Sequence, residues 1–294
     1  MKRVILFLAT NIAVMLTLGI TAHVLGLNQF ITAQGLDFFT LLLFAGLLGF
    51  GGAFISLALS KIVAKWSMKL TILNGTENAQ SVWLYSTIER QSNMEGIKMP
   101  EVAIYDSPEM NAFATGPSKN NSLVAVSTGL LNKMTKDEVE AVLGHEVAHI
   151  ANGDMVTMTL LQGVLNTFVI FFARVIAYAV EQFTRGSDNS ESSPGFVYFT
   201  VSIVLDVLFS ILASLLVSAY SRRREYAADR GGARLKSKEA MISALGKLST
   251  QTHNHLPVAV KSFGIFGLKQ KGILKLFASH PPIESRISKL KELH

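Results

Sequence analysis

Four long apolar segments divide the chain and alternate with stretches in which polar residues are frequent. The apolar segments are residues 4–25, 38–59, 155–180 and 196–220. Each is long enough to cross a bilayer as a helix, and the first two contain no Asp, Glu, Lys or Arg. Arg174 lies near the far end of the third segment, and Asp206 lies near the middle of the fourth. The pattern predicts four transmembrane helices.

Asp206 needs a partner inside the bundle, because an unpaired carboxylate in an apolar segment is costly. A functional role is the usual interpretation of such a residue, but here we favour a structural one, a hydrogen bond to Asn166, a threonine or Arg174 inside the bundle.

The remaining stretches have the pattern of a folded soluble domain in two parts, residues 64–154 and 221–294. In the first part, the pattern predicts a helix over 77–93, followed by short strands at 101–105, 111–115 and 123–126. A further helix begins at Thr135. The second part is helical, with helices over 238–248 and from Pro281 and Pro282 to Leu293. We expect a mostly α membrane protein with a soluble α+β domain.

Composition and charge support this division. Of the 294 residues, 49% are hydrophobic and only 16% are charged, which is too apolar for an ordinary soluble enzyme. The net charge of +6 does not indicate a nucleic-acid partner, because many of the basic residues flank apolar segments. They include Lys2, Arg3, Lys61, Lys65, Lys69 and Arg222 to Arg224. This placement predicts that the N-terminus and the soluble domain lie in the cytoplasm.

The helix that begins at Thr135 carries the sequence His145-Glu146-Val147-Ala148-His149. Histidines four residues apart lie on one helical face, so both can reach one metal ion, and the glutamate between them can reach an attacking water. The alternative is a pair of exposed histidines on an ordinary amphipathic helix. The apolar spacing around the motif makes that alternative the less favoured one.

A catalytic zinc site needs a third protein ligand, and the chain contains no cysteine that could supply it. A metzincin site is excluded, because it would need glycine and histidine where Asn152 and Met155 stand. Glu225 is a candidate ligand, and Asp229, four residues on, could orient a ligand histidine through its other ring nitrogen. The alternative for both is a solvated helix face beside the arginine cluster.

The order of the segments limits where this site can lie. His145 and His149 precede the second apolar pair and Glu225 follows it. All three can bind one ion only if the chain crosses the membrane an even number of times between them. The site is therefore expected at the cytoplasmic membrane face, where two membrane helices end.

Zinc and Glu146 together would perform amide hydrolysis, with Glu146 as general base. His280 and Arg286 are candidates for stabilising the oxyanion, although capping or surface roles are open for both. Asn111 to Ala114 could bind an extended substrate at a sheet edge, or could be a core strand.

Several motifs together resemble the HtpX heat-shock metallopeptidase family, membrane-bound relatives of the CAAX prenyl proteases. They are the histidine motif, Glu225 through Asp229, Asn111-Ala112-Phe113, and Ser279-His280-Pro281-Pro282 with Arg286. The resemblance covers essentially the whole chain. It implies a gluzincin-like endopeptidase with one zinc ion per chain, held by His145, His149 and Glu225.

The resemblance also implies that Asn111 and His280 contact the substrate or the transition state. We expect His280 to act in catalysis with Glu146, and the substrate to be bound by Asn111, Ala112, Phe113 and Arg286. The resemblance further implies a multi-pass protein of the bacterial inner membrane. There the protein would act with the FtsH protease in a stress response that removes misfolded membrane or cytoplasmic proteins.

Three other classes of protein are alternatives to a peptidase of this family. An intramembrane zinc protease would need an apolar motif helix, but Lys136, Asp137 and Glu138 begin this one in water. A transporter would need more polar residues along its spans than Asp206. A non-catalytic metal-binding membrane adaptor stays open as the alternative, although it would have no use for Glu146.

Overall fold

The computed structural model describes residues 17–18, 20–21, 23–26, 29–32, 35–187, 195–250 and 276–293. The chain divides into two compact units. The helical unit comprises Met1–Ser56 and Thr159–Val217, and the sheet unit comprises Leu57–Met158 and Ser218–His294. The predicted membrane segment 4–25 lies mostly outside the described residues and stays a prediction.

Three long helices supply the helical unit: α2 (Phe38–Met68), α6 (Asp154–Ser187) and α7 (Phe196–Leu235). Within the described part of the chain, these are the helices long and apolar enough to cross a membrane. They contain nearly all of the predicted segments 38–59, 155–180 and 196–220. Parts of each helix also belong to the sheet unit.

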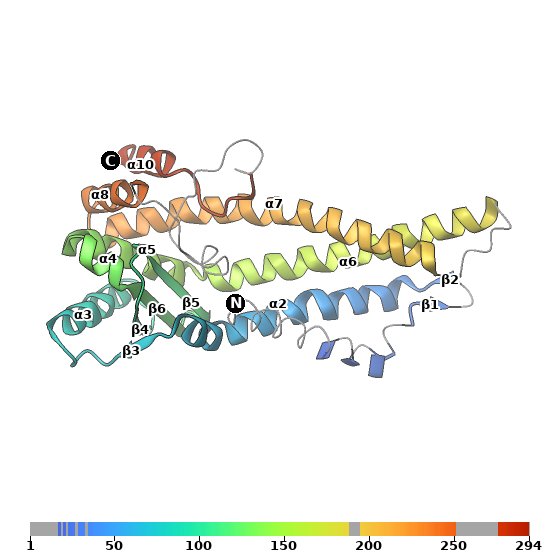
Figure 1. The fold of residues 1–294 in the computed structure, drawn as a ribbon, viewed down its shortest axis with the longest axis horizontal. Coiled ribbons are helices and arrows are strands. Elements are labelled where there is room, and N and C mark those ends of the chain that lie inside the picture. Colours follow the sequence, from blue (N-terminus) through green and yellow to red (C-terminus); the bar gives the residue numbers. More distant parts are fainter. Residues whose placement is uncertain are drawn as a thin grey trace. The chain divides into compact units, whose positions relative to one another are not determined.

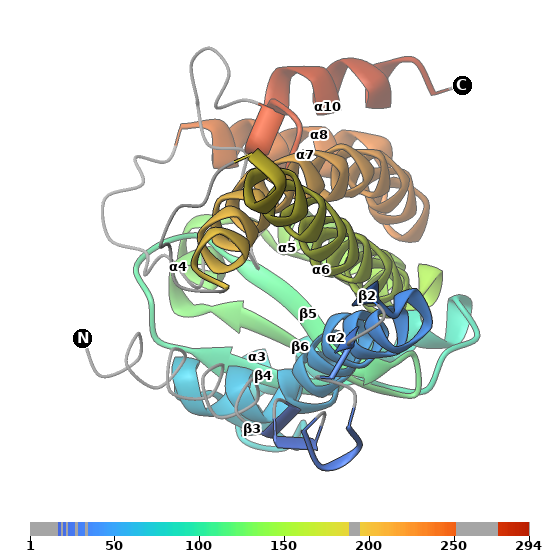
Figure 2. The ribbon, with the colours of Figure 1, turned by 90° about the vertical axis from the view of Figure 1, so that its right-hand side faces the viewer.

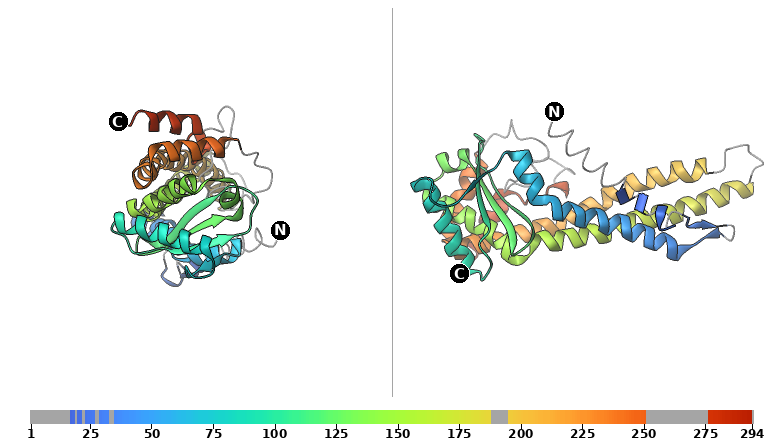
Figure 3. Two further views of the ribbon diagram at one scale, coloured as in Figure 1. Left: turned by 90° about the vertical axis from the view of Figure 1, so that its left-hand side faces the viewer. Right: turned by 90° about the horizontal axis from the view of Figure 1, so that it is seen from below.

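The helices of the helical unit run side by side, as Figures 1 and 3 show. Phe38 of α2 and Phe171 of α6 have ring centroids 6.4 Å apart. Arg174 of α6 forms an ion pair with Asp206 of α7, and both side chains are half-buried. Of the three partners considered for Asp206, the structure therefore selects Arg174. A short hairpin of β1 (Ile31–Thr32) and β2 (Gly35–Leu36) precedes α2.

The sheet unit contains a four-stranded sheet in the order β3-β4-β6-β5. Its strands are β3 (Thr71–Leu73), β4 (Glu101–Tyr105), β5 (Ala112–Ser118) and β6 (Asn121–Ser127). Strands β4 and β6 are parallel, and the other two pairs are antiparallel. Three of the four strands match the predicted ones closely, and β5 lies at one edge of the sheet.

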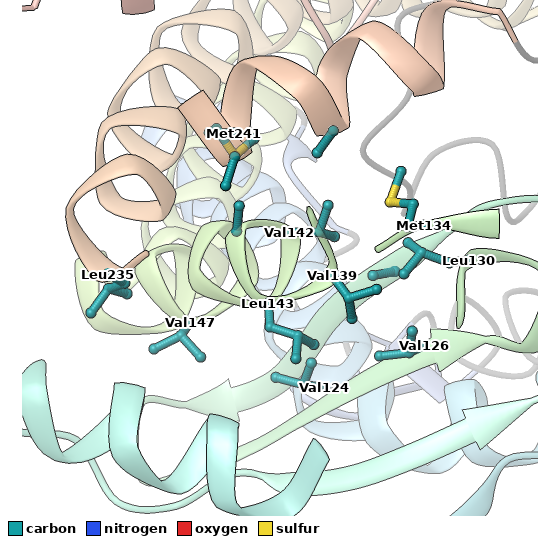
Figure 4. Packing of buried hydrophobic residues seen from close by; sticks show 14 of the residues in the cluster. Val124, Val126, Leu130, Met134, Val139, Val142, Leu143, Val147, Leu235 and Met241 are labelled. Atoms are coloured by element: carbon teal, nitrogen blue, oxygen red, sulfur yellow. The ribbon is translucent and has the colours of Figure 1, made fainter. Parts of the chain in front are cut away.

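Helices cover both faces of this sheet. Among the described residues, the helices that lie wholly within the unit are α3 (Ala79–Met94), α4 (Thr128–Lys133), α5 (Lys136–Asn152), α8 (Lys238–Ser249) and α10 (Ile283–Lys291). Helices α3 and α5 pack on one face, where Figure 4 shows Val124 of β6 next to Leu143 of α5, and Val126 of β6 next to Val139. On the other face, Tyr105 and Phe113 belong to a second apolar cluster that meets the last turns of α2.

Helices α8 and α10 lie next to each other and complete the unit (Figure 2). Apolar residues of both join the larger cluster, among them Met241 and Leu245 of α8 and Leu290 of α10. The core of the sheet unit therefore extends from the sheet through α5 to these two helices, and α5 is packed on more than one side.

Candidate metal centre

Helix α5 begins and ends where local chemistry predicts. The Thr135 hydroxyl accepts a hydrogen bond from the backbone N–H of Glu138, and the Glu138 carboxylate accepts one from the backbone N–H of Thr135 at 2.7 Å. This capping box satisfies donors of the first turn. Gly153 ends the helix in the left-handed conformation, with φ 70°. The predicted motif helix is confirmed.

Helix α7 passes very close to α5, and glycine makes this approach feasible. A Cβ atom on Gly231 would lie 2.3 Å from the Cβ atom of Ala148, and one on Gly232 would lie 2.7 Å from the carbonyl oxygen of Ala141. Glu225 lies less than two helical turns before Gly231 on α7. The close packing therefore brings the Glu225 carboxylate to the histidines of α5.

The side chains of His145, His149 and Glu225 converge on one point. The two Nε2 atoms lie 3.1 Å apart. Glu225 places Oε1 at 3.3 Å from His149 Nε2 and Oε2 at 3.7 Å from His145 Nε2. One ligand atom from each residue lies within 4.8 Å of the others, so the three could hold one metal ion.

The Nδ1 atom of His145 faces a carboxylate, as the sequence suggested. It lies 3.0 Å from Asp229 Oδ1. Asp229 in turn accepts two hydrogen bonds from the guanidinium of Arg286, one of them from Nε at 2.7 Å. All three side chains are almost completely buried. Asp229 is therefore placed to orient His145, and Arg286 balances its charge.

The Nδ1 atom of His149 also faces a carboxylate, one that sequence reasoning missed. It is hydrogen-bonded to Asp154 Oδ2 at 2.6 Å. Asp154 is the first residue of α6 and forms an ion pair with Arg224 of α7. The sequence feature that could have indicated this contact is a carboxylate directly after Gly153, where α5 ends.

These donors fit a metal ion such as zinc. Burial lowers the pKa of His145 to about 4, so its ring is neutral at pH 7. When each Nδ1 carries the ring proton toward its aspartate, both Nε2 lone pairs point toward each other and toward Glu225. Such a grouping favours a positive charge among the three, which a metal ion or a proton would supply. Burial alone would lower the pKa of His149, but the hydrogen bond with Glu225 and the attraction to its charge outweigh burial and raise it. Two imidazole nitrogens and a carboxylate are a common protein ligand set for catalytic zinc.

Glu146 lies between the two histidines in sequence and is 4% exposed. Burial raises the pKa of Glu146 to about 7, against the opposing effects of His149 and of a hydrogen bond from the backbone of Ala114. Ala114 belongs to β5, so the carboxylate lies beside the outer strand of the sheet. A group with this pKa can accept and release a proton near neutral pH.

The structure places Asn111, Ala112 and Phe113 at the start of β5, with all three side chains buried. Ala112 faces the cluster under α5, and Phe113 lies on the opposite face against Tyr105, with ring centroids 5.8 Å apart. The side chains of Ala112 and Phe113 are therefore core residues here. The part of β5 that contacts Glu146 is its backbone, at Ala114.

His280 and Arg286 both lie at Glu225. His280 Nδ1 is 2.7 Å from Glu225 Oε2, and Arg286 Nη1 is 3.4 Å from the same oxygen. They differ in access, because the His280 side chain is 11% exposed and that of Arg286 is 0% exposed. The structure thus brings His280 and Arg286 together at the Glu225 carboxylate, and Arg286 is completely buried there.

The chain is similar to known proteins in sequence and in fold. The model of peptidase family M48 matches residues 78–294. Proteins described as "Protease HtpX homolog" from Chlorobium phaeobacteroides and Paracidovorax citrulli are 55% and 53% identical over 292 residues, covering 99% of this chain and of each relative. The crystal structure of S. mikatae Ste24p has a similar fold, with a TM-score of 0.66 at 20% identity. That match covers 98% of this chain and 66% of Ste24p.

Proposed function

Because the chain belongs to peptidase family M48, we propose that it works as a zinc-dependent endopeptidase with His145, His149 and Glu225 as the metal ligands. The protein is a membrane metallopeptidase, as its family, its relatives and its long apolar helices indicate. The single observation that carries the zinc proposal is the convergence of these three side chains on one point.

A bound zinc ion would polarise the scissile carbonyl and lower the pKa of the attacking water. The protein's own part in the reaction begins with Glu146. Its carboxylate takes a proton from the attacking water as the C–O bond forms, and delivers that proton to the amide nitrogen as the C–N bond breaks. The raised pKa of Glu146 suits both steps at neutral pH.

We assign the oxyanion contact to His280. Its Nδ1 is held beside Glu225, and its slight exposure leaves the other side of the ring accessible to a substrate. Arg286 was predicted as a substrate contact, but its complete burial favours a supporting role, in which it holds Asp229 and Glu225 in place.

The substrate would bind as an extended segment along β5. Successive residues of an edge strand direct their backbone groups alternately toward the neighbouring strand and away from it. The backbone of Asn111 bonds to Ser127 at the end of β6, so Ala112 and Ala114 direct theirs outward. Pairing with this edge requires an unfolded peptide segment, whatever its side chains.

Such a binding mode favours misfolded or damaged proteins as substrates. Helices α6 and α7 connect the site residues with apolar segments, so we infer that membrane proteins are cleaved at the cytoplasmic face of a bacterial inner membrane. The basic residues at the ends of these segments support this orientation. Membrane lipid is then a permanent partner, and the FtsH protease a functional one.

The alternative function, a metal-binding adaptor without catalysis, uses the same ligands but gives no role to Glu146. Its burial beside the ligands and the outer strand favours the peptidase.

Cleavage of casein by the full-length protein in detergent tests the proposal. We expect Glu146→Gln to reduce cleavage about 10²- to 10⁴-fold while the zinc content stays at about one ion per chain. Glu89→Gln, an exposed carboxylate on α3, is the matched control and should cleave as the wild type does. Full activity of Glu146→Gln would overturn the general-base role. A wild type that binds zinc but cuts nothing would favour the adaptor.

A further inference from the structure

Each of the two histidines at the candidate metal centre has an aspartate at its Nδ1 atom, and each aspartate pairs with an arginine. The two sets are His145–Asp229–Arg286 and His149–Asp154–Arg224. The role of Asp229 in the first set was predicted from the spacing of Glu225 and Asp229. In the second set, only His149 has a role in the function proposed above, and Asp154 and Arg224 have none so far.

The second set joins three separate elements. His149 lies in the last turn of α5, Asp154 begins α6, and Arg224 precedes Glu225 on α7. The His149 and Arg224 side chains are 17% exposed, and that of Asp154 is 8% exposed. The contact with Asp154 is therefore shielded from water on most sides, so its hydrogen bond is stronger than one at the surface.

Arg224 is itself held in place by its surroundings. Its guanidinium donates hydrogen bonds to the Tyr220 hydroxyl at 3.2 Å and to the carbonyl oxygen of Asn152 at 3.4 Å. It also lies over the Tyr220 ring, 5.7 Å from the centroid. The arginine therefore presents a fixed positive charge to Asp154 and limits the directions in which that carboxylate can turn.

We propose that Asp154, held by Arg224, is a positioning residue for the metal ligand His149. Asp154 accepts a hydrogen bond from the Nδ1–H group of His149, which keeps the ring proton on Nδ1 and the lone pair on Nε2. The same bond sets the plane of the ring, so that Nε2 faces His145 and Glu225. Ligand histidines commonly depend on such a hydrogen bond for their orientation and basicity. This inference rests on the proposed function, because it takes His149 to be a ligand.

The test compares zinc affinities of full-length variants in detergent, all carrying Glu146→Gln so that no self-cleavage occurs. Competition with a chromogenic chelator gives the dissociation constant. We expect Asp154→Asn to weaken zinc binding about 10- to 100-fold and Arg224→Gln to weaken it less. Because the two residues act in series, the double variant should bind no more weakly than Asp154→Asn alone. Arg223→Gln, which removes an adjacent exposed charge, is the control and should leave affinity unchanged.

Two further readouts separate positioning from a general effect on folding. The visible absorption spectrum of the cobalt-loaded protein should change in Asp154→Asn, because the ligand field changes. The thermal unfolding midpoint of the metal-free variant should stay close to that of its parent.

Wild-type affinity in Asp154→Asn would overturn the proposal. So would weaker binding with an unchanged cobalt spectrum and a matching fall in metal-free stability. A parent protein that binds no zinc would overturn this proposal and the proposed function together.

Discussion

The two units of this protein use the same pair of side chains in different ways. In the helical unit, Arg174 and Asp206 join α6 to α7, with side-chain exposures of 21% and 32%. In the sheet unit, Arg286 and Asp229 are 0% and 2% exposed, and Asp229 also reaches His145. The first pair satisfies charges within an apolar segment. The second holds His145, a proposed metal ligand, so we expect its loss to affect metal binding and the loss of the first pair to affect stability alone.

Matched replacement of the two arginines gives the largest expected effect. Arg286→Leu leaves the Asp229 and Glu225 carboxylates buried without their cation, which should cost about 3–5 kcal/mol of stability and abolish zinc binding. Arg174→Leu should lower stability but keep the zinc. Thermal unfolding and metal analysis of both full-length variants in detergent test this. Retained zinc in Arg286→Leu, or lost zinc in Arg174→Leu, would contradict the comparison.

Exchange of the charges in the helical unit should give a smaller effect. Arg174→Asp or Asp206→Arg alone places like charges opposite each other between two apolar segments. Either change should lower the free energy of unfolding by about 2.5–3.5 kcal/mol. The double variant restores opposite charges and should recover most of this loss. Unfolding midpoints of the two single variants and the double variant measure the coupling. A double variant as unstable as the sum of the singles would show that the pair does not join the helices.

The smallest expected effect concerns an ion pair of the sheet unit that does not touch the metal centre. Burial alone would raise the pKa of Glu138, but hydrogen bonds with Lys247, Ser243 and Thr135 outweigh burial and lower it to about 2. The folded-state pKa lies below the ordinary value of 4.5, so the carboxylate stabilises the fold above that pH. This stabilisation is lost as pH falls toward 2.

We therefore expect Glu138→Gln to lower the free energy of unfolding by about 1–2 kcal/mol at pH 7, and by much less when measured near pH 2. Zinc content at pH 7 should not change. Denaturant unfolding at both pH values measures the difference, with Glu89→Gln as an exposed control. An equal deficit at both pH values would show that the charge of Glu138 does not contribute.

Local chemistry explains which features the sequence could predict. The capping box at Thr135 and Glu138 and the left-handed Gly153 bound α5, and the spacing of His145 and His149 sets them on one face. The long helices that contain residues 38–59, 155–180 and 196–220 follow from apolar length, although Arg174 and Asp206 lie within two of these segments. Strand β3 was missed, because three residues are too few to show a period.

Tertiary contacts explain what the sequence could not show. Asp154 follows His149 by five residues across a helix end, so no helical spacing relates the two. The chain direction after Gly153 decides that contact. For Asn111 to Phe113, the strand was predicted close to its observed place, but its place at the sheet edge and the burial of its side chains depend on β6 and α5.

The zinc content of Glu225→Ala, compared with that of Glu146→Gln and the wild type, tests the central claim most directly. The account predicts about one zinc per chain in the wild type and in Glu146→Gln, and a loss of both zinc and cleavage in Glu225→Ala. Retention of zinc and full activity in Glu225→Ala would contradict it, because the third ligand would then lie elsewhere.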